Sequence, residues 1–563
     1  MARIIGIDFG TSTTVVKYMD EGDNDVKVVT DADGGSVIPS AVYRTPEGKY
    51  AFGCEAITLH DYSELYKCDD NVETGEFFTN FKMDLLDQQN SQKREKAEEL
   101  IALFFKEHII KLIQKTIPDL HYKEYVLALS FPAKWTPGMS DAIERIAKNA
   151  GFNATAIIRK NEPTAAVLNM IYKHKLHLTE SGILKVNKPI HIFMLDMGAG
   201  TTDIAIFRFM VDENGKYTVD NLFPYPSIDN PYLCGGREID DILYNYVQEC
   251  FKRCGVEFEF SKQFIKEWKD TLLSECLKHN LTINKLPNGI ACNLPKEDFA
   301  RLTQIFYIDR SVFEAKTCDH WRNLYKLIES SVKEYKRLYN KGAEDIDLLC
   351  LTGGHSKWYT VENLFNGEGV FGSIGKVYSN DGSYLQNVIK FEKLIKEPYR
   401  IEKFLDSKPQ ECVANGLCYY RNKHIDVYTT SANNIWVQLV INNVESEILE
   451  VVNYGQILPC TKVANINLGI ITKDYQSDLN NEFRGFVKVF SGKDFNADRF
   501  DRIDIDLCLG LFEYMFGGSK YDVKFNCEFT VEDNNSMGVK GDVVFKSQSA
   551  FYAPRKVVSF NKR

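Results

Sequence analysis

The chain has 563 residues, of which 44% are hydrophobic and 26% are charged. This composition is typical of folded globular proteins, so global disorder is excluded, and at roughly 150 residues per domain the length predicts about three or four domains or subdomains. The 78 acidic residues exceed the 68 basic ones, for a formal net charge of −10. This charge argues against a nucleic-acid or anionic-membrane binder, because both need a cationic surface.

Fourteen cysteines are scattered along the chain, and none forms a CxxC pair. The opening residues, MARIIGIDFG, do not follow the charged-then-apolar pattern of a targeting leader. No apolar run reaches the roughly 20 residues that a membrane span needs. These features predict a cytoplasmic protein in a reducing compartment, with neither nucleic acid nor membrane as a partner.

Two stretches of the chain share one pattern, an apolar run that ends in Asp and is followed by glycine and threonine. They are IIGIDFGTST at residues 4–13 and IHIFMLDMGAGTTDIAIF at residues 190–207. Each predicts a buried strand, a tight glycine turn and a second strand. The two aspartates, Asp8 and Asp196, lie 188 positions apart. The repeat therefore indicates a duplication, with two similar lobes that face each other across a cleft.

Helical and strand patterns alternate between and after these two stretches. Helices are predicted over residues 93–115, 140–150, 163–175, 239–254, 262–282 and 320–340, and further strands over 124–133 and 345–354. Pro163 suits the first turn of its helix, and Gly151 suits the end of the helix before it. Such alternation over roughly 420 residues predicts an α/β assembly.

The pattern changes after about Arg421. Residues 485–492, 521–531 and 541–547 alternate apolar and polar side chains, and turn-like clusters separate them. This spacing predicts one antiparallel β domain over residues 426–563.

The two glycine turns have the composition of anion-binding loops. A strand that ends in glycine and small hydroxyl residues leaves several backbone N–H groups pointing the same way, which suits phosphate oxygens. The first turn contains Gly10, Thr11, Ser12 and Thr13, and the second contains Gly198, Ala199, Gly200, Thr201 and Thr202. Asp8 and Asp196 precede these turns, and two carboxylates beside bound phosphates are the hard oxygen ligands that hydrated Mg²⁺ prefers.

The two turns, together with TGGHSK at residues 352–357, resemble the phosphate and adenosine motifs of the actin-fold ATPases. Within that superfamily of actin, sugar kinases and seventy-kilodalton heat-shock chaperones, three segments resemble the chaperones. They are VLALSFPA (126–133), RKNEPTAAVLNM (159–170) and CGGREIDDILYNYV (234–247). The resemblance covers about residues 3–420.

The resemblance implies an α/β actin-like ATPase fold with two lobes, a ribonuclease-H-like duplicated core and a β-rich C-terminal domain. The nucleotide-binding domain would cover residues 1–421. Lobe I would comprise about residues 1–188 and 365–421, and lobe II about residues 189–364. A β-sandwich-like domain would follow at residues 426–563.

The resemblance also implies roles for individual residues. The catalytic set would be Lys82, which offsets charge on the γ-phosphate, Asp196, which orients the attacking water, and Glu162, which couples nucleotide state to lobe closure. Asp8 and Asp196 would hold the hydration shell of the metal. The nucleotide-binding set would be Gly10, Thr11, Ser12, Thr13, Gly198, Ala199, Gly200, Thr201, Gly236, Arg237, Glu275, Lys278, Thr282, Gly353, Gly354, His355, Ser356 and Lys357.

Simpler structural interpretations stay open for some of these residues. Lys82 is also compatible with a solvated lysine, Glu162 with an acid at a helix start, and the Glu275–Lys278 pair with a surface ion pair. Three positions depart from the family pattern: Ala199 replaces a glycine, His279 replaces an adenine-stacking arginine, and Gln410 replaces an acidic residue. None of them removes the phosphate machinery, so the sequence predicts a slow ATPase.

The β domain loosely resembles the peptide-gripping sandwich of the chaperones, through residues 453–462, 485–492 and 521–541. Residues 421–435 lack the family's acidic-aliphatic linker, and no helical lid follows the sandwich in this sequence. The resemblance implies a chaperone with the cofactors ATP/ADP and Mg²⁺ and with unfolded peptide or protein clients. Its partners could include a co-chaperone or exchange factor. The alternatives are a nucleotide-switched scaffold that docks one dedicated partner, and a small-molecule kinase.

Overall fold

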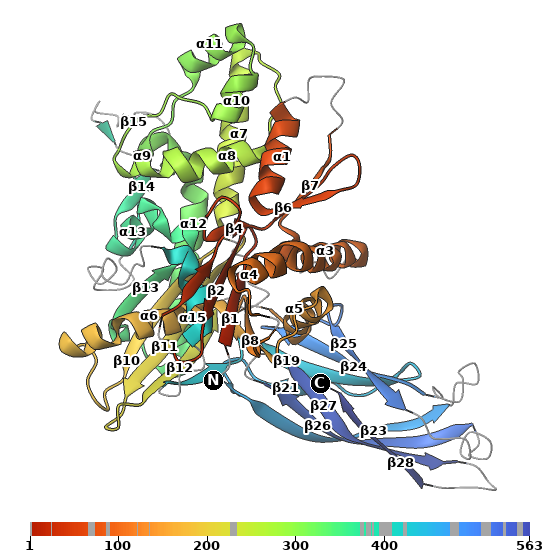
Figure 1. The fold of residues 1–563 in the computed structure, drawn as a ribbon. Coiled ribbons are helices and arrows are strands. Elements are labelled where there is room, and N and C mark those ends of the chain that lie inside the picture. The colour runs from red at the N-terminus through yellow and green to blue at the C-terminus, as the bar shows by residue number, and fades with distance from the viewer. Residues whose placement is uncertain are drawn as a thin grey trace.

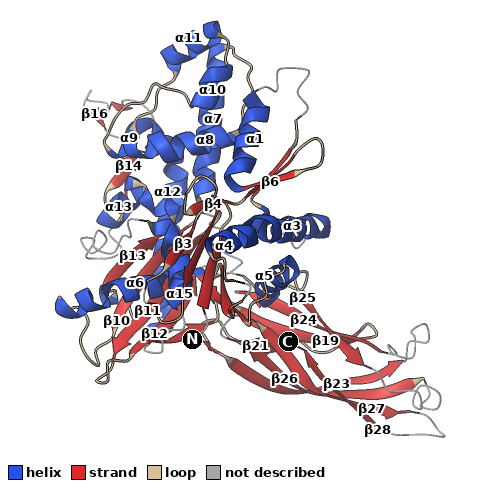
Figure 2. Cartoon of the chain, viewed as in Figure 1, coloured by secondary structure: helices blue, strands red, loops and turns tan. Residues whose placement is uncertain are grey.

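The computed structural model describes residues 3–23, 25–65, 74–85, 90–120, 122–133, 135–225, 234–371, 377–378, 384–385, 388–392, 408–419, 425–472, 483–507, 519–532, 536–548 and 555–562. Helices gather around two sheets in the N-terminal part, while the C-terminal strands form a separate body with no helix among its described residues (Figures 1 and 2). The chain is therefore mixed α/β with a β-rich C-terminal region.

The first sheet is built from N-terminal strands in the order β3-β2-β1-β8-β9, with β4 also paired to β2. These strands are β1 (Arg3–Phe9), β2 (Thr13–Met19), β3 (Lys27–Val29), β4 (Val37–Pro39), β8 (Tyr125–Phe131) and β9 (Ala156–Asn161). Strands β1 and β2 form an antiparallel hairpin, and β8 runs parallel to β1. Every residue of β8 is buried, because a central parallel strand is covered on both faces.

A small three-stranded sheet and several helices surround this first sheet. The elements are β5 (Ala41–Arg44), β6 (Tyr50–Phe52), β7 (Glu76–Thr79), α1 (Gly53–Leu65), α2 (Phe81–Asp84), α3 (Ser91–Phe104), the π-helix η1 (Phe105–Ile109), α4 (Ile110–Thr116) and α5 (Pro137–Ala150). The helix predicted over 93–115 is confirmed, although one turn of it is π-helical. Helix α5 begins at Pro137 because Thr136 caps it, and it ends as predicted at Gly151, whose φ is 100°.

The second sheet repeats the central unit of the first. Its order is β13-β10-β11-β12-β18-β22, from β10 (Ile190–Met197), β11 (Thr202–Val211), β12 (Tyr217–Tyr225), β13 (Leu348–Thr352), β18 (Ile425–Thr430) and β22 (Ile457–Leu458). Strands β10 and β11 form a hairpin and β13 runs parallel to β10, as β8 does to β1. Asp8 pairs with Val15 and Asp196 with Asp203, so the two hairpins share one register. The predicted duplication is confirmed at the level of these strands.

Helices and short strands around the second sheet form a large core of their own. They are α7 (Gly236–Cys254), α8 (Lys262–Trp268), the π-helix η2 (Lys269–Leu273), α9 (Ser274–Lys278), α10 (Asn288–Asn293), α11 (Lys296–Ile305), α12 (Arg310–Tyr339), the 3₁₀ turns η3 (Ala343–Asp345) and η4 (Gly354–Lys357), α13 (Tyr359–Asn366), β14 (Gly369–Phe371), β15 (Val377–Tyr378), β16 (Tyr384–Leu385) and β17 (Val388–Lys390). Phe365, Val370 and Phe391 belong to this core. The return to lobe I expected at residue 365 is therefore wrong, because the chain still packs on the second lobe there.

Two crossing helices join the two sheets. Helix α6 (Glu162–Glu180) packs on β10, β11 and β13 of the second sheet, whereas α15 (Cys412–Tyr419), which follows the 3₁₀ turn η6 (Pro409–Glu411), packs on β1, β2 and β8 of the first. The two helices thus pack against each other between the sheets. Where they cross, a Cβ atom on Gly416 would lie 1.6 Å from the carbonyl oxygen of Ala165. Only glycine allows this approach.

The β domain is a sandwich of two antiparallel sheets. One sheet has the order β20-β19-β24-β25, with β21 also paired to β19, and the other has the order β23-β26-β27-β28. The strands are β19 (Asn434–Ile441), β20 (Val444–Glu445), β21 (Leu449–Val452), β23 (Cys460–Thr472), β24 (Phe483–Gly492), β25 (Asp501–Leu507), β26 (Lys520–Val531), β27 (Met537–Ser547) and β28 (Arg555–Lys562). Alternate residues of both sheets fill one core, which confirms the strands predicted at 485–492, 521–531 and 541–547.

Strand β18 corrects the expected boundary of the β domain. It pairs in parallel with β12 at the edge of the second sheet, and Thr430 Oγ1 donates to the carbonyl of Asn221 at 3.0 Å. Residues 425–430 therefore belong to the sheet of lobe II and not to the domain predicted at 426–563. The start of the predicted linker, residues 421–424, lies outside the described residues.

Each cysteine that the structure describes is free. Among the described residues, no helix is both long and apolar enough to cross a membrane.

We predict that Gly416→Ala destabilises the protein by about 3 kcal/mol, because its methyl group would force the two crossing helices apart. The midpoint of the first unfolding transition in urea measures this effect. Gly35→Ala is the control, since a Cβ there would meet only the exposed side chain of Asp33. Equal stability of the two variants would contradict the tight crossing.

Candidate functional site

A cavity of about 310 Å³ lies between the two sheets, where their hairpin turns face each other. Most of the site residues predicted from the sequence line it. They are Asp8, Gly10, Thr11, Ser12, Thr13, Lys82, Glu162, Asp196, Gly198, Ala199, Gly200, Thr201, Gly236, Gly353, Gly354, His355 and Lys357. Gln410, the position at which the chain departs from the family's acidic residue, also lines the cavity. The fold thus brings together residues that are hundreds of positions apart.

The two glycine turns have the same geometry. The amide of Gly10 donates to the carbonyl of Thr13 at 3.0 Å, and the amide of Gly198 donates to that of Thr201 at 2.9 Å. The turns also approach each other, because a Cβ on Gly200 would lie 2.7 Å from Thr11 Oγ1. Residues of both glycine turns therefore line one small volume, where backbone amides would suit a chain of phosphate groups.

Neighbouring elements hold each turn in place. Ser40, which follows β4, donates from its amide to Ser12 O at 2.9 Å and from its hydroxyl to Gly10 O at 3.0 Å. On the other side, the first amides of α7, Gly236 and Arg237, donate to Gly198 O and Ala199 O at 3.1 and 2.9 Å. These contacts engage carbonyls of both turns and fix the turns beside the cavity.

Helix α7 approaches the second turn closely because of one further glycine. A Cβ on Gly235 would lie 2.5 Å from Ala199 O, so a larger residue would displace the turn. Arg237 contributes its amide to this contact, but its side chain lies outside the cavity lining. Its predicted place as a direct nucleotide contact is therefore not supported by its position.

Acidic side chains gather at the base of the cavity. Burial raises the pKa of Asp8 to about 7, and the neighbouring carboxylate of Glu162 adds to this rise. Burial and the charges of Glu162, Asp8 and Asp203 also raise the pKa of Asp196 well above its usual range. A divalent cation between Asp8 and Asp196 would offset these repulsions, and carboxylate oxygens are the donors that Mg²⁺ prefers. The donor set therefore fits the metal that the sequence predicts.

Lys82 lies beside these carboxylates. Its ammonium donates to Glu162 Oε1 at 2.8 Å and to the carbonyl of Phe9, and it lies 5.6 Å from the centre of the Trp135 ring. The lysine is only 4% exposed, so the solvated-lysine interpretation is wrong. Glu162 occupies the first turn of α6 and also lines the cavity, so its position at a helix start and its place in the site are compatible.

The third glycine turn follows β13. Gly353 has a φ of 80°, and a Cβ there would lie 2.4 Å from Met197 O and 2.6 Å from Asp196 Oδ1. Ser356 lies beneath this turn, where its hydroxyl donates to Gly353 O at 2.7 Å. Ser356 is absent from the cavity lining, so its position indicates a part in shaping the turn.

Three predicted nucleoside contacts do not reach the cavity. Glu275 is exposed and pairs with His279 at 2.9 Å, and Lys278 and Thr282 are exposed as well. The surface-pair interpretation therefore holds for Glu275, although its partner is His279 and not Lys278. The cavity is instead lined on this side by residues the sequence analysis did not select, which are Asp240, Lys266, Lys269, Asp270 and Ser274.

The helical run of α8, η2 and α9 contains a π turn, and the last of its residues to line the cavity is Ser274, where its cavity face ends. The polar spacing of Lys266, Lys269, Asp270 and Ser274 marks that face in the sequence. Only the backbone hydrogen bonding reveals the π turn itself.

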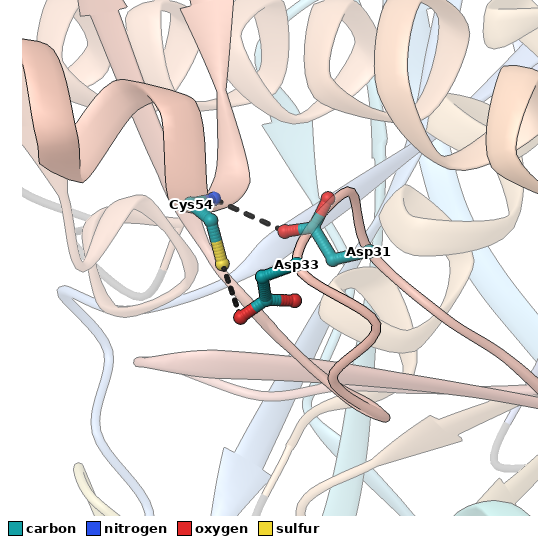
Figure 3. Close-up of side chains that lie close together, drawn as sticks. All are labelled: Asp31, Asp33 and Cys54. Atoms are coloured by element: carbon teal, nitrogen blue, oxygen red, sulfur yellow. Dashed lines mark hydrogen bonds between the residues drawn. The ribbon is translucent and has the colours of Figure 1, made fainter.

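A cluster of Asp31, Asp33 and Cys54 lies away from this cavity and offers three potential metal ligands (Figure 3). Asp31 accepts hydrogen bonds from the amides of Ala32 and Cys54, at 2.8 and 3.0 Å. Cys54 Sγ lies 3.3 Å from Asp33 Oδ2, and burial raises the pKa of its thiol well above the usual value. The contacts are those of a carboxylate that holds the start of α1, so the cluster is accounted for without a metal.

The Hsp70 protein family model matches residues 82–368, just over half of the chain. The chaperone protein DnaK of Thermosipho melanesiensis is 25% identical over 371 residues, which are 64% of this chain and 54% of that protein. The chain thus spans about half the length of this relative. Because this family match covers more than half of the chain, the chain belongs to the Hsp70 family.

Proposed function

We propose that this protein is an ATP-binding and ATP-hydrolysing chaperone whose β domain binds protein or peptide segments under nucleotide control. The observation that carries the proposal is the pair of facing glycine turns with the same hydrogen bond, each preceded by an aspartate that lines the cavity. Phosphate groups between the turns would meet amides from both lobes, so nucleotide binding would favour lobe closure.

The proposed roles of the individual residues follow from the charges in the cavity. Asp8 and Asp196 would hold Mg²⁺ through its water shell, and the metal would neutralise negative charge on the phosphates. Lys82 would place its ammonium where charge develops on the transferred phosphoryl group, held there by Glu162 and by the carbonyl of Phe9. This proposal includes the domain arrangement, the site residues and the catalytic roles.

We expect Lys82→Ala to lower the rate of ATP hydrolysis about 100-fold while ATP still binds, because a preorganised cation acts mainly on the transition state. Single-turnover hydrolysis and equilibrium binding of ATP separate the two effects. Lys111→Ala removes an exposed lysine on α4 that pairs with Glu107, and serves as the control. Unchanged hydrolysis in Lys82→Ala would refute the catalytic assignment.

The structure and the sequence pattern predict different lysines as nucleotide contacts, Lys266 and Lys278, and this difference can be tested. Lys266 lines the cavity, burial lowers its pKa, and it forms no ion pair with a described residue. It is therefore free to bind the nucleotide. Loss of one charge-assisted hydrogen bond costs about 1.5 kcal/mol or more, so Lys266→Ala should weaken ATP binding about tenfold. Lys278→Ala should leave the affinity for ATP unchanged. Weaker ATP binding in Lys278→Ala than in Lys266→Ala would instead support Lys278 as the nucleotide contact, as the sequence predicts.

Two of the contacts between the β domain and the ATPase lobes lie near the cavity or its sheets. Strand β22 of this region pairs with β18, which extends the sheet of lobe II. Strand β25 lies beside α5 (Figure 1), and the carboxylate of its Asp501 accepts from Thr136 Oγ1 at 2.8 Å and from the amide of Gly138 at 3.2 Å. Trp135 and Pro132, just before this helix, line the cavity. These contacts support coupling between nucleotide and β domain.

We predict that ATP accelerates release of a fluorescent unstructured peptide from the wild-type protein, and that Asp501→Ala reduces this acceleration several-fold. The reason is that the variant removes both hydrogen bonds to α5 without touching the cavity. Asp504→Ala, on the same strand and exposed, is the control. Fluorescence anisotropy after addition of Mg·ATP measures the release rate.

Two outcomes would contradict this part of the proposal. Equal acceleration in Asp501→Ala and wild type would exclude the α5 contact from the coupling. Failure of the peptide to bind in either nucleotide state would favour the alternative, a nucleotide-switched scaffold that docks one dedicated partner.

A further inference from the structure

A second cavity, of about 200 Å³, adjoins the one between the glycine turns. Ser12, Asp240 and Lys266 line both cavities, so the two meet beside the first glycine turn. Residues of α1, β4, β5 and β7 form the wall on the side of lobe I, and residues of α7 and α8 form it on the side of lobe II. The second cavity therefore lies in the cleft between the lobes.

A polar contact between the lobes borders this second cavity. His60 of α1 has its Nε2 2.9 Å from Oγ of Ser261, which precedes α8, and its ring stacks on Phe77 of β7 at a centroid distance of 3.9 Å. Ser261 and Phe77 both line the second cavity. Its shape thus depends on how closely the two lobes approach each other.

The acidic groups of the second cavity are already paired. Its lining contains two carboxylates, and Asp240 pairs with Lys269 at 2.5 Å while Asp241 pairs with Lys262 at 2.6 Å. Each negative charge therefore has a positive partner beside it. These pairs weaken the repulsion that an anion in the cavity would otherwise meet.

Arg237 supplies a positive charge that no described residue offsets. It lines the second cavity and not the first, it is half-buried, and its guanidinium forms no hydrogen bond or ion pair with a described residue. Its amide is engaged by Ala199 O, so the side chain is what it can offer a ligand. The planar guanidinium has several N–H donors in an arrangement that matches phosphate oxygens.

Two further donors lie at the wall that the cavities share. The hydroxyl of Ser12 has no partner among the described residues, and Lys266 has no ion pair with one. An oxyanion in the second cavity would therefore find donors on both sides, from the first glycine turn and from α7 and α8. One water molecule needs roughly 15 Å³, so about 200 Å³ accommodates an ion of five heavy atoms.

We propose that the second cavity binds inorganic phosphate, through Arg237, while a nucleotide occupies the first cavity. This inference rests on the proposed function, because ATP hydrolysis would release phosphate next to Ser12. The ion can have two sources: the γ-phosphate that hydrolysis has just freed, and phosphate from the solution.

The test titrates inorganic phosphate into protein saturated with Mg²⁺ and a non-hydrolysable ATP analogue, followed by ³¹P NMR at constant ionic strength. The analogue fills the γ-phosphate position, so any further phosphate must bind elsewhere. Wild type is compared with Arg237→Gln, which removes the charge, and with Arg237→Lys, which keeps it. Arg253→Gln is the matched control, because Arg253 is an exposed arginine of the same helix that lines neither cavity.

Wild type and Arg253→Gln should bind phosphate with the same dissociation constant. Arg237→Gln should bind it at least tenfold more weakly, because the charge-assisted hydrogen bonds of the guanidinium are lost. Arg237→Lys should lie between them, since the ammonium keeps the charge but not the paired donors.

A second measurement identifies the source of the phosphate. Single-turnover hydrolysis of γ-labelled ATP is followed by rapid filtration, with and without saturating unlabelled phosphate. If the product leaves through the second cavity, unlabelled phosphate should slow release of the label several-fold in wild type and much less in Arg237→Gln. Equal release rates in wild type under both conditions would identify phosphate from the solution as the ligand.

Three results of the titration would overturn the inference. They are the absence of phosphate binding to the analogue-saturated wild type, equal phosphate affinities of wild type and Arg237→Gln, and a parallel loss of affinity for the analogue in Arg237→Gln. The proposed function would stand in each case, because wild type still binds the analogue. If wild type does not bind the analogue, the proposed function fails, and the same comparison of variants without nucleotide then decides on the phosphate site.

Discussion

The crossing of α6 and α15 at Gly416 is the constraint on which the rest of the structure depends. Helix α6 leaves the first sheet at Asn161 and packs on the second, while α15 leaves the second lobe and packs on the first. The approach of Gly416 to the carbonyl of Ala165 brings both sheets against one shared core. Because the hairpin turns extend from those sheets, this packing also determines how far apart the two turns lie and hence the width of the cavity.

Electrostatics within the cavity follow from the same packing. Burial raises the pKa values of Asp8 and Asp196 above the usual range of an aspartate. The nearby carboxylate of Glu162 adds to both rises. The ammonium of Lys82 offsets part of this charge. The site therefore has unfavourable charge repulsion that a cation would relieve, so the acidic base and the amide-lined turns favour a metal and phosphate bound together.

The second sheet connects the cavity to the β domain. Asn221 of β12 donates to Thr164 Oγ1 in the first turn of α6, and its carbonyl accepts from Thr430 of β18. Strand β18 pairs in turn with β22. One run of backbone and side-chain hydrogen bonds thus extends from the helix that begins at Glu162 to the C-terminal region. A shift of α6 relative to the second sheet would act on this edge directly.

The sequence by itself determined the repeated strand, turn and strand units, most of the cavity residues and the alternating strands of the β domain, because these depend on local periodicity and on glycine, proline and aspartate at fixed spacing. Only the tertiary structure decided the crossing of α6 with α15 and the place of β18, since both depend on contacts between segments about 200 residues apart or more. It also decided that Lys266 and Ser274 line the cavity in place of Lys278 and Thr282, because the part of a helix that faces the other lobe depends on tertiary packing and not on side-chain spacing.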